Sequence, residues 1–187
     1  GISSYLDPYP ALCLGTSDLS VHEMVGAYSI FANKGVWVEP IVVTKIEDNM
    51  GNLLKEFIPE KREAMNERTA SVMLNMLMGV VDGVYSPAAQ KRIGTAVRLR
   101  YKYKLANQIA GKTGTSQVVS RRHHKDTKLE DILEHERTHA LFVGYAQAEA
   151  ARFATVVMLE NAGGGSSAAA PVGRDALLAA LKWMRQT

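Results

Sequence analysis

The spacing of apolar residues along the chain predicts three helices. The clearest covers residues 20–33, where a Ser20-x-x-Glu23 capping box opens a run of apolar residues at helical spacing and Gly35 can supply a left-handed cap. A second helix is expected after Asn66, and a third closes the chain. The apolar faces of these two helices comprise Ala70, Met73, Leu74, Leu77 and Val81, and Leu177, Ala180, Leu181 and Met184.

Other stretches have the length and alternation of β-strands. Residues 97–105 alternate strictly between apolar and basic side chains, which predicts a strand with one buried and one charged face. The stretch 82–96 is interpreted as a connection, and the charged stretch 118–138 as an exposed loop with a short helix. Two antiparallel hairpins are expected, formed by residues 41–47 with 53–57 and by residues 139–146 with 153–160.

Composition limits the class of protein. The chain has 187 residues, 47% hydrophobic and 22% charged, with a net charge of +3, as in a globular protein of one domain or two subdomains. Basic residues concentrate in 91–104 and 121–128, but this charge does not demand a nucleic-acid partner, and none is predicted. Cys13 is the only cysteine, which excludes an internal disulfide, and its apolar neighbours predict a buried thiol.

The segment most suggestive of chemistry is Lys112-Thr113-Gly114-Thr115, within residues 109–117. On a strand it offers an ammonium, two hydroxyls and backbone N–H groups, which suit a carboxylate and a carbonyl oxygen that gains negative charge during acyl transfer. Gly114 allows a ligand close to the backbone. An ordinary strand with a solvated lysine is the alternative. A phosphate-binding P-loop is excluded because Ala106 stands where that motif needs glycine.

A second motif, His135-Glu136-Arg137-Thr138-His139, matches the His-Glu-x-x-His pattern of zinc peptidases. That chemistry requires one helix through both histidines, with His135 and His139 binding the same ion. Here His139 opens a predicted strand, so a zinc peptidase is kept only as an alternative. Its third ligand would be Glu160, His123 or His124.

Taken together, these motifs resemble the transpeptidase domain of penicillin-binding proteins. The likeness is to the bifunctional class A proteins up to about Gln117, and to the monofunctional class B transpeptidases beyond it. The class A-like segments are Leu14–Ser20, Phe31–Val36, Pro40, Ile46–Asp48, Gly51-Asn52, Gly94–Ala96, Arg98–Arg100 and Ile109–Gln117; the class B-like segments are Glu136–Tyr145 and Leu159–Asn161.

The resemblance implies a mixed α/β (α+β) fold, with an antiparallel sheet flanked by helices, as in penicillin-binding proteins and serine β-lactamases. It also implies an extracytoplasmic serine acyltransferase without a cofactor, acting on the D-Ala-D-Ala stem peptide of peptidoglycan and binding β-lactams. Lys112 would support acylation, and the backbone N–H of Thr115 would form half of the oxyanion hole. Thr113, Gly114 and Thr115 would bind the substrate, the two hydroxyls holding its terminal carboxylate.

The sequence departs from the family at the nucleophile. The family uses a Ser-x-x-Lys motif and a Ser-x-Asn motif, and this chain contains neither. Residues 1–187 are therefore expected to be the C-terminal part of a transpeptidase domain, with a helical and hairpin scaffold in 1–96 and the sheet strands, motif and last helix in 97–187. The remainder of the domain and any membrane anchor are expected outside this chain, which alone would be inactive. A non-catalytic interaction module is the other alternative.

Overall fold

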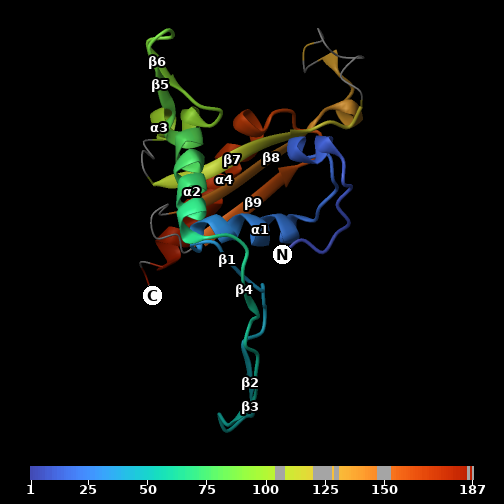
Figure 1. The fold of residues 1–187 in the computed structure, drawn as a ribbon, viewed down its shortest axis with the longest axis vertical. Helices are drawn as coiled ribbons and strands as arrows, with labels where there is room; N and C mark the ends of the chain where they lie inside the picture. The colour runs from blue at the N-terminus through green and yellow to red at the C-terminus, as the bar shows by residue number, and fades with distance from the viewer. Residues whose placement is uncertain (104–107, 120–127, 129–130, 147–152, 185, 187) are drawn as a thin grey trace. The chain divides into compact units, whose positions relative to one another are not determined.

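The computed structural model describes residues 1–103, 108–119, 128, 131–146, 153–184 and 186 (Figure 1). The chain divides into two compact units, residues 1–70 and 71–187. Each unit contains helices and antiparallel strand pairs, so the mixed α/β fold class predicted from the sequence is confirmed. No helix in the described part of the chain is both long and apolar enough to cross a membrane.

The first unit is built on helix α1, Val21–Ala32. The predicted capping box is present, because the Ser20 hydroxyl accepts the Glu23 N–H at 3.1 Å while the Glu23 carboxylate accepts the Ser20 N–H at 3.0 Å. The helix is followed by Gly35 at φ +89°, where a Cβ would lie 2.0 Å from the Met65 carbonyl oxygen. Glycine is therefore required there by conformation and by space.

The Glu23 carboxylate also ties the N-terminal segment to α1. It is 8% exposed and accepts hydrogen bonds from the backbone N–H and hydroxyl groups of Ser3 and Ser4, all between 2.7 and 2.9 Å. A short 3-10 helix, η1 (Pro10–Leu14), follows this segment. The prediction of a buried Cys13 is wrong, because η1 contains no buried residue and leaves the thiol exposed.

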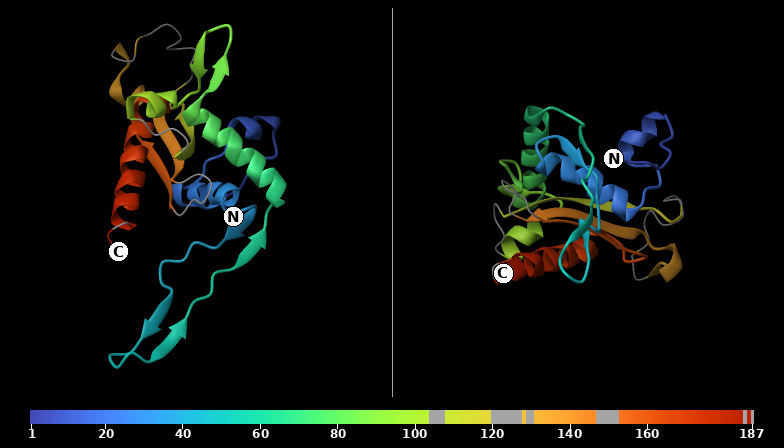
Figure 2. Two further views of the ribbon diagram at one scale, coloured as in Figure 1. Left: turned by 90° about the vertical axis from the view of Figure 1, so that its left-hand side faces the viewer. Right: turned by 90° about the horizontal axis from the view of Figure 1, so that it is seen from below.

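A long β-ribbon completes the first unit (Figure 2). At its tip the Asp48 carboxylate accepts the N–H groups of Met50 and Asn52, each at 2.8 Å, which closes the predicted hairpin turn. The first strand of this hairpin begins at Lys45, whereas the sequence predicted a start at residue 41. The antiparallel pairs are β1 (Val36–Val38) with β4 (Lys61–Glu63), and β2 (Lys45–Glu47) with β3 (Leu53–Glu56).

Helix α2, Glu67–Asp82, begins in the first unit and runs into the second. Ala70, Leu77 and Val81 are buried, which confirms most of the predicted apolar face. The stretch that follows is not a plain connection. It contains a second hairpin, formed by β5 (Val84–Ser86) and β6 (Lys91–Ile93).

The predicted strand at 97–105 is wrong: residues Val97–Tyr103 form helix α3, and 104–107 lie outside the described residues. Among the alternating apolar positions 97, 99 and 101, whose burial is described, Leu99 is deeply buried, at 1% exposure, whereas Tyr101 is 59% exposed. The helix allows Leu99 to enter the core while the neighbouring Arg100 reaches Asp82 on α2, with Nη1 and Oδ1 3.1 Å apart. These two contacts with the rest of the unit outweigh a weak local preference for strand.

The second unit is centred on a three-stranded antiparallel sheet in the order β7-β8-β9. The predicted hairpin of the last two strands is confirmed, and its turn, 147–152, lies outside the described residues. Helix α4 covers one face of the sheet (Figure 2). A π-helical turn, η6 (Gly165–Ala169), leads directly into this helix. The other bounds are β7 (Ile109–Ser116), β8 (His139–Ala146), β9 (Phe153–Leu159) and α4 (Ala170–Met184).

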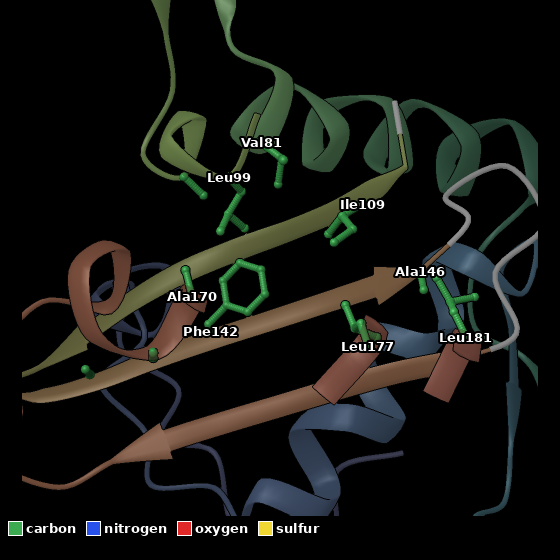
Figure 3. Close-up of a cluster of buried hydrophobic side chains, with 11 residues drawn as sticks. Val81, Leu99, Ile109, Phe142, Ala146, Ala170, Leu177 and Leu181 are labelled. Atoms are coloured by element: carbon green, nitrogen blue, oxygen red, sulfur yellow. The ribbon is translucent and has the colours of Figure 1, made fainter. Parts of the chain in front are cut away.

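The core of this unit lies between the sheet and helices α2, α3 and α4 (Figure 3). Phe142 belongs to this core and is fully buried. Three glycines lie against the ring and leave it the space that it fills. A Cβ would approach a ring atom to 2.8 Å at Gly111, 2.6 Å at Gly144 and 2.4 Å at Gly173. The other buried members are Val81, Ala96, Leu99, Ile109, Ala140, Ala146, Ala169, Ala170, Leu177 and Leu181.

Candidate functional site

The Lys112–Thr115 motif lies on a strand, β7, as the family resemblance implied, and this strand runs from the core to the surface. Ile109, Ala110 and Gly111 are buried at its start, whereas Lys112 and Thr115 are exposed and Thr113 is half-buried. β7 is an edge strand of the described sheet, bonded to β8 alone. An edge strand leaves part of its backbone N–H and C=O groups free of the sheet's own ladder, so the motif lies where a ligand can approach it.

The pairing of β7 with β8 fixes which way the motif side chains face. Its register runs without a shift from Ile109 opposite Ala146 to Ser116 opposite His139, so the motif contains no bulge. Strand alternation then places Thr113 and Thr115 on the face of Phe142, toward α4, and Lys112 on the opposite face. The Lys112 ammonium bends back onto the Thr113 carbonyl oxygen, 2.6 Å away.

A close backbone contact holds the middle of the motif against the start of the last helix. A Cβ at Gly165 would lie 2.3 Å from the carbonyl oxygens of both Gly114 and Leu141. Only glycine therefore fits at position 165, and because it has no side chain, η6 packs directly on the β7–β8 ladder. This contact supports the middle of β7.

Thr95 is part of this site, although its place in the sequence predicts no role for it beyond family likeness. Its Oγ1 lies 2.9 Å from Thr113 Oγ1, a hydrogen bond between two hydroxyls 18 residues apart in the sequence. Thr95 is exposed, but the next residue, Ala96, is fully buried and donates its N–H to the Val80 carbonyl oxygen at 3.0 Å. Since residues so distant form no periodic pattern, only the folded chain reveals this contact.

The turn that presents Thr95 is tightly packed against the end of α2. A Cβ at Gly94 would lie 2.8 Å from the Val80 carbonyl oxygen and 3.0 Å from that of Gly79. On the other side of the turn, the Arg100–Asp82 ion pair joins α3 to α2, with side chains 25% and 11% exposed. Thr95 therefore stands on a backbone that has little freedom to move relative to α2.

The structure contradicts the geometry that a zinc peptidase would need. Residues Glu134–Glu136 form a short 3-10 helix, η4, that ends at Arg137 in an extended conformation, and His139 opens β8. No single helix carries both His135 and His139, so their side chains are not one helical turn apart. The Nδ1 of His139 instead accepts the Asn161 N–H at 2.9 Å.

The proposed third zinc ligands do not restore that site. Where residues are described, no group of three His, Cys, Asp or Glu side chains is placed to hold a metal ion. Glu160 is exposed at the end of β9, and His123 and His124 lie outside the described residues. The zinc alternative is therefore not carried further.

Comparison with known families agrees with this fold and motif. The model of the penicillin-binding protein transpeptidase domain matches residues 11–178, which is most of the chain. The chain thus belongs to the penicillin-binding protein transpeptidase domain family, as its sequence motifs predicted.

Relatives of both expected kinds are found. The chain is 30% identical to penicillin-binding protein 2D of Bacillus subtilis over 123 residues, covering 64% of this chain and 17% of the relative. It is 34% identical to penicillin-binding protein 1A of Aquifex aeolicus over 111 residues, covering 59% and 14%. It is also 39% identical over 70 residues to the peptidoglycan D,D-transpeptidase MrdA of Haemophilus influenzae, covering 37% and 11%.

A solved structure of the same family has the same fold. Penicillin-binding protein 3 of Mycobacterium tuberculosis, complexed with aztreonam, superposes with a TM-score of 0.67 at 25% identity, covering 94% of this chain and 37% of that one. The chain thus spans about a third of the solved transpeptidase and less than a fifth of the curated relatives above.

Proposed function

We propose that residues 109–117 are the carboxylate-binding strand of a peptidoglycan D,D-transpeptidase. The observation that carries this proposal is the position of Lys112–Thr115 on the free edge of the sheet, with the ammonium and both hydroxyls at least partly accessible. Family membership supports it, because the part of the chain that matches the domain model, residues 11–178, includes the whole motif. The substrate is the D-Ala-D-Ala end of a peptidoglycan stem peptide, whose terminal carboxylate the two threonine hydroxyls bind.

The motif acts on the reaction by stabilising negative charge. In serine acyl transfer, a serine oxygen attacks the carbonyl carbon before the terminal D-Ala, and the carbonyl oxygen becomes an oxyanion. The Thr115 N–H donates to that oxyanion, and the Lys112 ammonium favours the developing charge. The terminal D-Ala then leaves with a proton on its nitrogen, and an acceptor amine later displaces the serine from the acyl group. Gly114 leaves room for the substrate beside the strand.

The nucleophile of this reaction comes from outside the 187 residues. No serine here is followed three positions later by lysine, and no asparagine is preceded two positions earlier by serine. We expect the chain alone to be inactive. β-Lactams carry the same carboxylate and belong to the proposed ligand class, in line with the aztreonam complex of the relative from Mycobacterium tuberculosis. The site then works on the extracytoplasmic side of the cell envelope, where peptidoglycan is assembled.

Intact-mass measurement after incubation with excess penicillin tests where the nucleophile is. The chain alone is expected to keep its mass, because acylation needs a serine activated by a neighbouring base. An adduct one penicillin heavier, located on a serine of this chain, would contradict the proposal that the nucleophile lies elsewhere.

Peptide binding tests the strand itself. We expect a short D-Ala-D-Ala peptide with a free carboxylate to shift the Thr113–Thr115 amide signals in NMR spectra, and its C-terminal amide to shift them less. Lys112→Ala should remove this preference, whereas Lys91→Ala, which changes another exposed strand lysine of the same unit, should keep it. Equal binding of both peptides, or equal effects of the two substitutions, would favour the non-catalytic interaction module.

A further inference from the structure

The hydroxyl pair of Thr95 and Thr113 has a property that a single hydroxyl lacks. Each threonine hydroxyl has one proton and two acceptor lone pairs, and it rotates to suit its surroundings. At an Oγ1–Oγ1 distance of 2.9 Å one hydroxyl donates and the other accepts, and in this structure the donor is Thr113. If Thr113 donates to Thr95, Thr113 presents only lone pairs to a ligand. If Thr95 donates to Thr113, the Thr113 proton is free for the ligand.

We infer that Thr95 is the positioning residue of the carboxylate site. When a carboxylate binds, the hydrogen bond between the two hydroxyls reverses, so that Thr95 donates to Thr113 and directs the Thr113 proton toward the carboxylate. This inference rests on the proposed function and names a residue that the motif does not include. A carboxylate is an acceptor only, so its arrival favours the orientation in which Thr113 donates to it and Thr95 donates to Thr113.

Two structural features favour this orientation once a ligand is bound. First, hydrogen bonds in a chain polarise one another, so the bond from Thr95 makes the Thr113 proton a better donor to the carboxylate. Second, Thr95 stands on the turn fixed by the Ala96 N–H to Val80 carbonyl bond, so its oxygen has a defined place. Preorganisation of this kind lowers the entropy lost when the ligand binds.

The same contact explains how the hydroxyl of Thr113 is held from outside the sheet. Its neighbour across the ladder is Phe142, whose ring is fully buried and offers no polar atom. Thr95 comes from the segment between β6 and α3, and thus from outside the sheet. Loss of the Thr95 hydroxyl therefore leaves Thr113 free to adopt rotamers that turn its hydroxyl away from the ligand.

The experiment compares the affinity of the 187-residue chain for the carboxylate peptide with its affinity for the C-terminal amide, both measured by NMR titration. Thr95→Val removes the hydroxyl and keeps the shape, Thr95→Ser keeps the hydroxyl, and Thr155→Val is a matched change on strand β9 of the same sheet. We expect Thr95→Val to reduce the carboxylate preference about three- to tenfold, the value of one neutral hydrogen bond. Thr95→Ser should stay within about twofold of the natural chain, and Thr155→Val should match it.

The outcomes separate this inference from the proposed function. If the natural chain shows no carboxylate preference, the proposed function fails and the inference fails with it. If the preference exists and is lost in Thr113→Val but not in Thr95→Val, only the inference is overturned. If Thr95→Ser is as weak as Thr95→Val, the residue acts through packing, and its role as a hydroxyl donor is refuted. Spectra of the free variants, overlaid on the natural one, verify that each is folded.

Discussion

Substitution of Gly173 by alanine tests whether the stability of the second unit depends on the space that glycine leaves for the buried Phe142 ring. Gly173 lies in α4, where alanine is favoured over glycine by about 1 kcal/mol from backbone entropy alone. The added Cβ would lie 2.4 Å from Phe142 Cδ1 and 3.0 Å from Cε1, which is far inside van der Waals contact. Helix propensity and packing thus predict opposite signs for the same substitution.

Packing should win, because the ring has nowhere to go. The Cζ end of the ring is already close to the backbone of Gly111 and Gly144, and Phe142 is fully buried. Overpacking a filled core costs about 1–3 kcal/mol. We expect a cost near the upper limit and, after the gain in helix propensity, a net loss of about 2 kcal/mol. With a typical slope of about 2 kcal/mol per molar urea, the unfolding midpoint should fall by about 1 M.

Gly79→Ala is the matched control. Gly79 also lies inside a helix of the second unit, α2, but a Cβ there meets nothing closer than Val84 Cγ2 at 3.8 Å. This variant should therefore unfold at a higher urea concentration than the natural chain, by up to about 0.5 M. Urea unfolding followed by circular dichroism measures both. If the unfolding midpoint of Gly173→Ala is at or above that of the unsubstituted chain, the packing argument is refuted. If the argument is right, adding Phe142→Leu to Gly173→Ala should partly restore stability.

Three further predictions concern charged groups. Hydrogen bonds from Ser20 and Ser4 hold the pKa of the Glu23 carboxyl far below its ordinary 4.5, so the stability it supplies is complete above that pH and is lost as the solution becomes more acid. The thermal midpoint should therefore fall more steeply below about pH 5 in the natural chain than in Glu23→Gln. Arg100→Met should cost about 1.5–3 kcal/mol in urea unfolding by leaving the Asp82 carboxylate without this partner, whereas the exposed Arg98→Met should be nearly neutral. Asp48→Ala should speed hydrogen exchange of the Met50 and Asn52 amides, measured by NMR, because both donate to its carboxylate.

Local signals sufficed for much of the fold. Three local patterns agree with the tertiary structure: the capping box at Ser20, the apolar runs of the last hairpin and the apolar face of α2. Here pattern and packing give the same answer. These are places where nearby residues alone decide the conformation. The motif strand differs from them, because its position in the sheet was expected from the family resemblance, and the glycines inside it do not by themselves favour a strand.

The sequence misled where a tertiary contact outweighed the local pattern. Val97–Tyr103 alternates like a strand, yet the burial of Leu99 and the Arg100–Asp82 pair require a helix. Cys13 lies in an apolar run that is too short and too near the surface to be buried. Thr95 could not be assigned, because its partner Thr113 is brought near by the whole of the intervening chain. Sequence spacing alone contains no trace of such a contact.

The glycines around Phe142 have a consequence for how such a site can vary over evolutionary time. Gly144 and Gly173 contact the ring and not the exposed motif, but Phe142 is the cross-strand neighbour of Thr113. Inherited changes at these inner positions would move the ring and, through the strand pair, the hydroxyl at the surface. Selection for ligand preference can thus change residues that no ligand contacts. A survey of variants that is limited to the motif would overlook these changes.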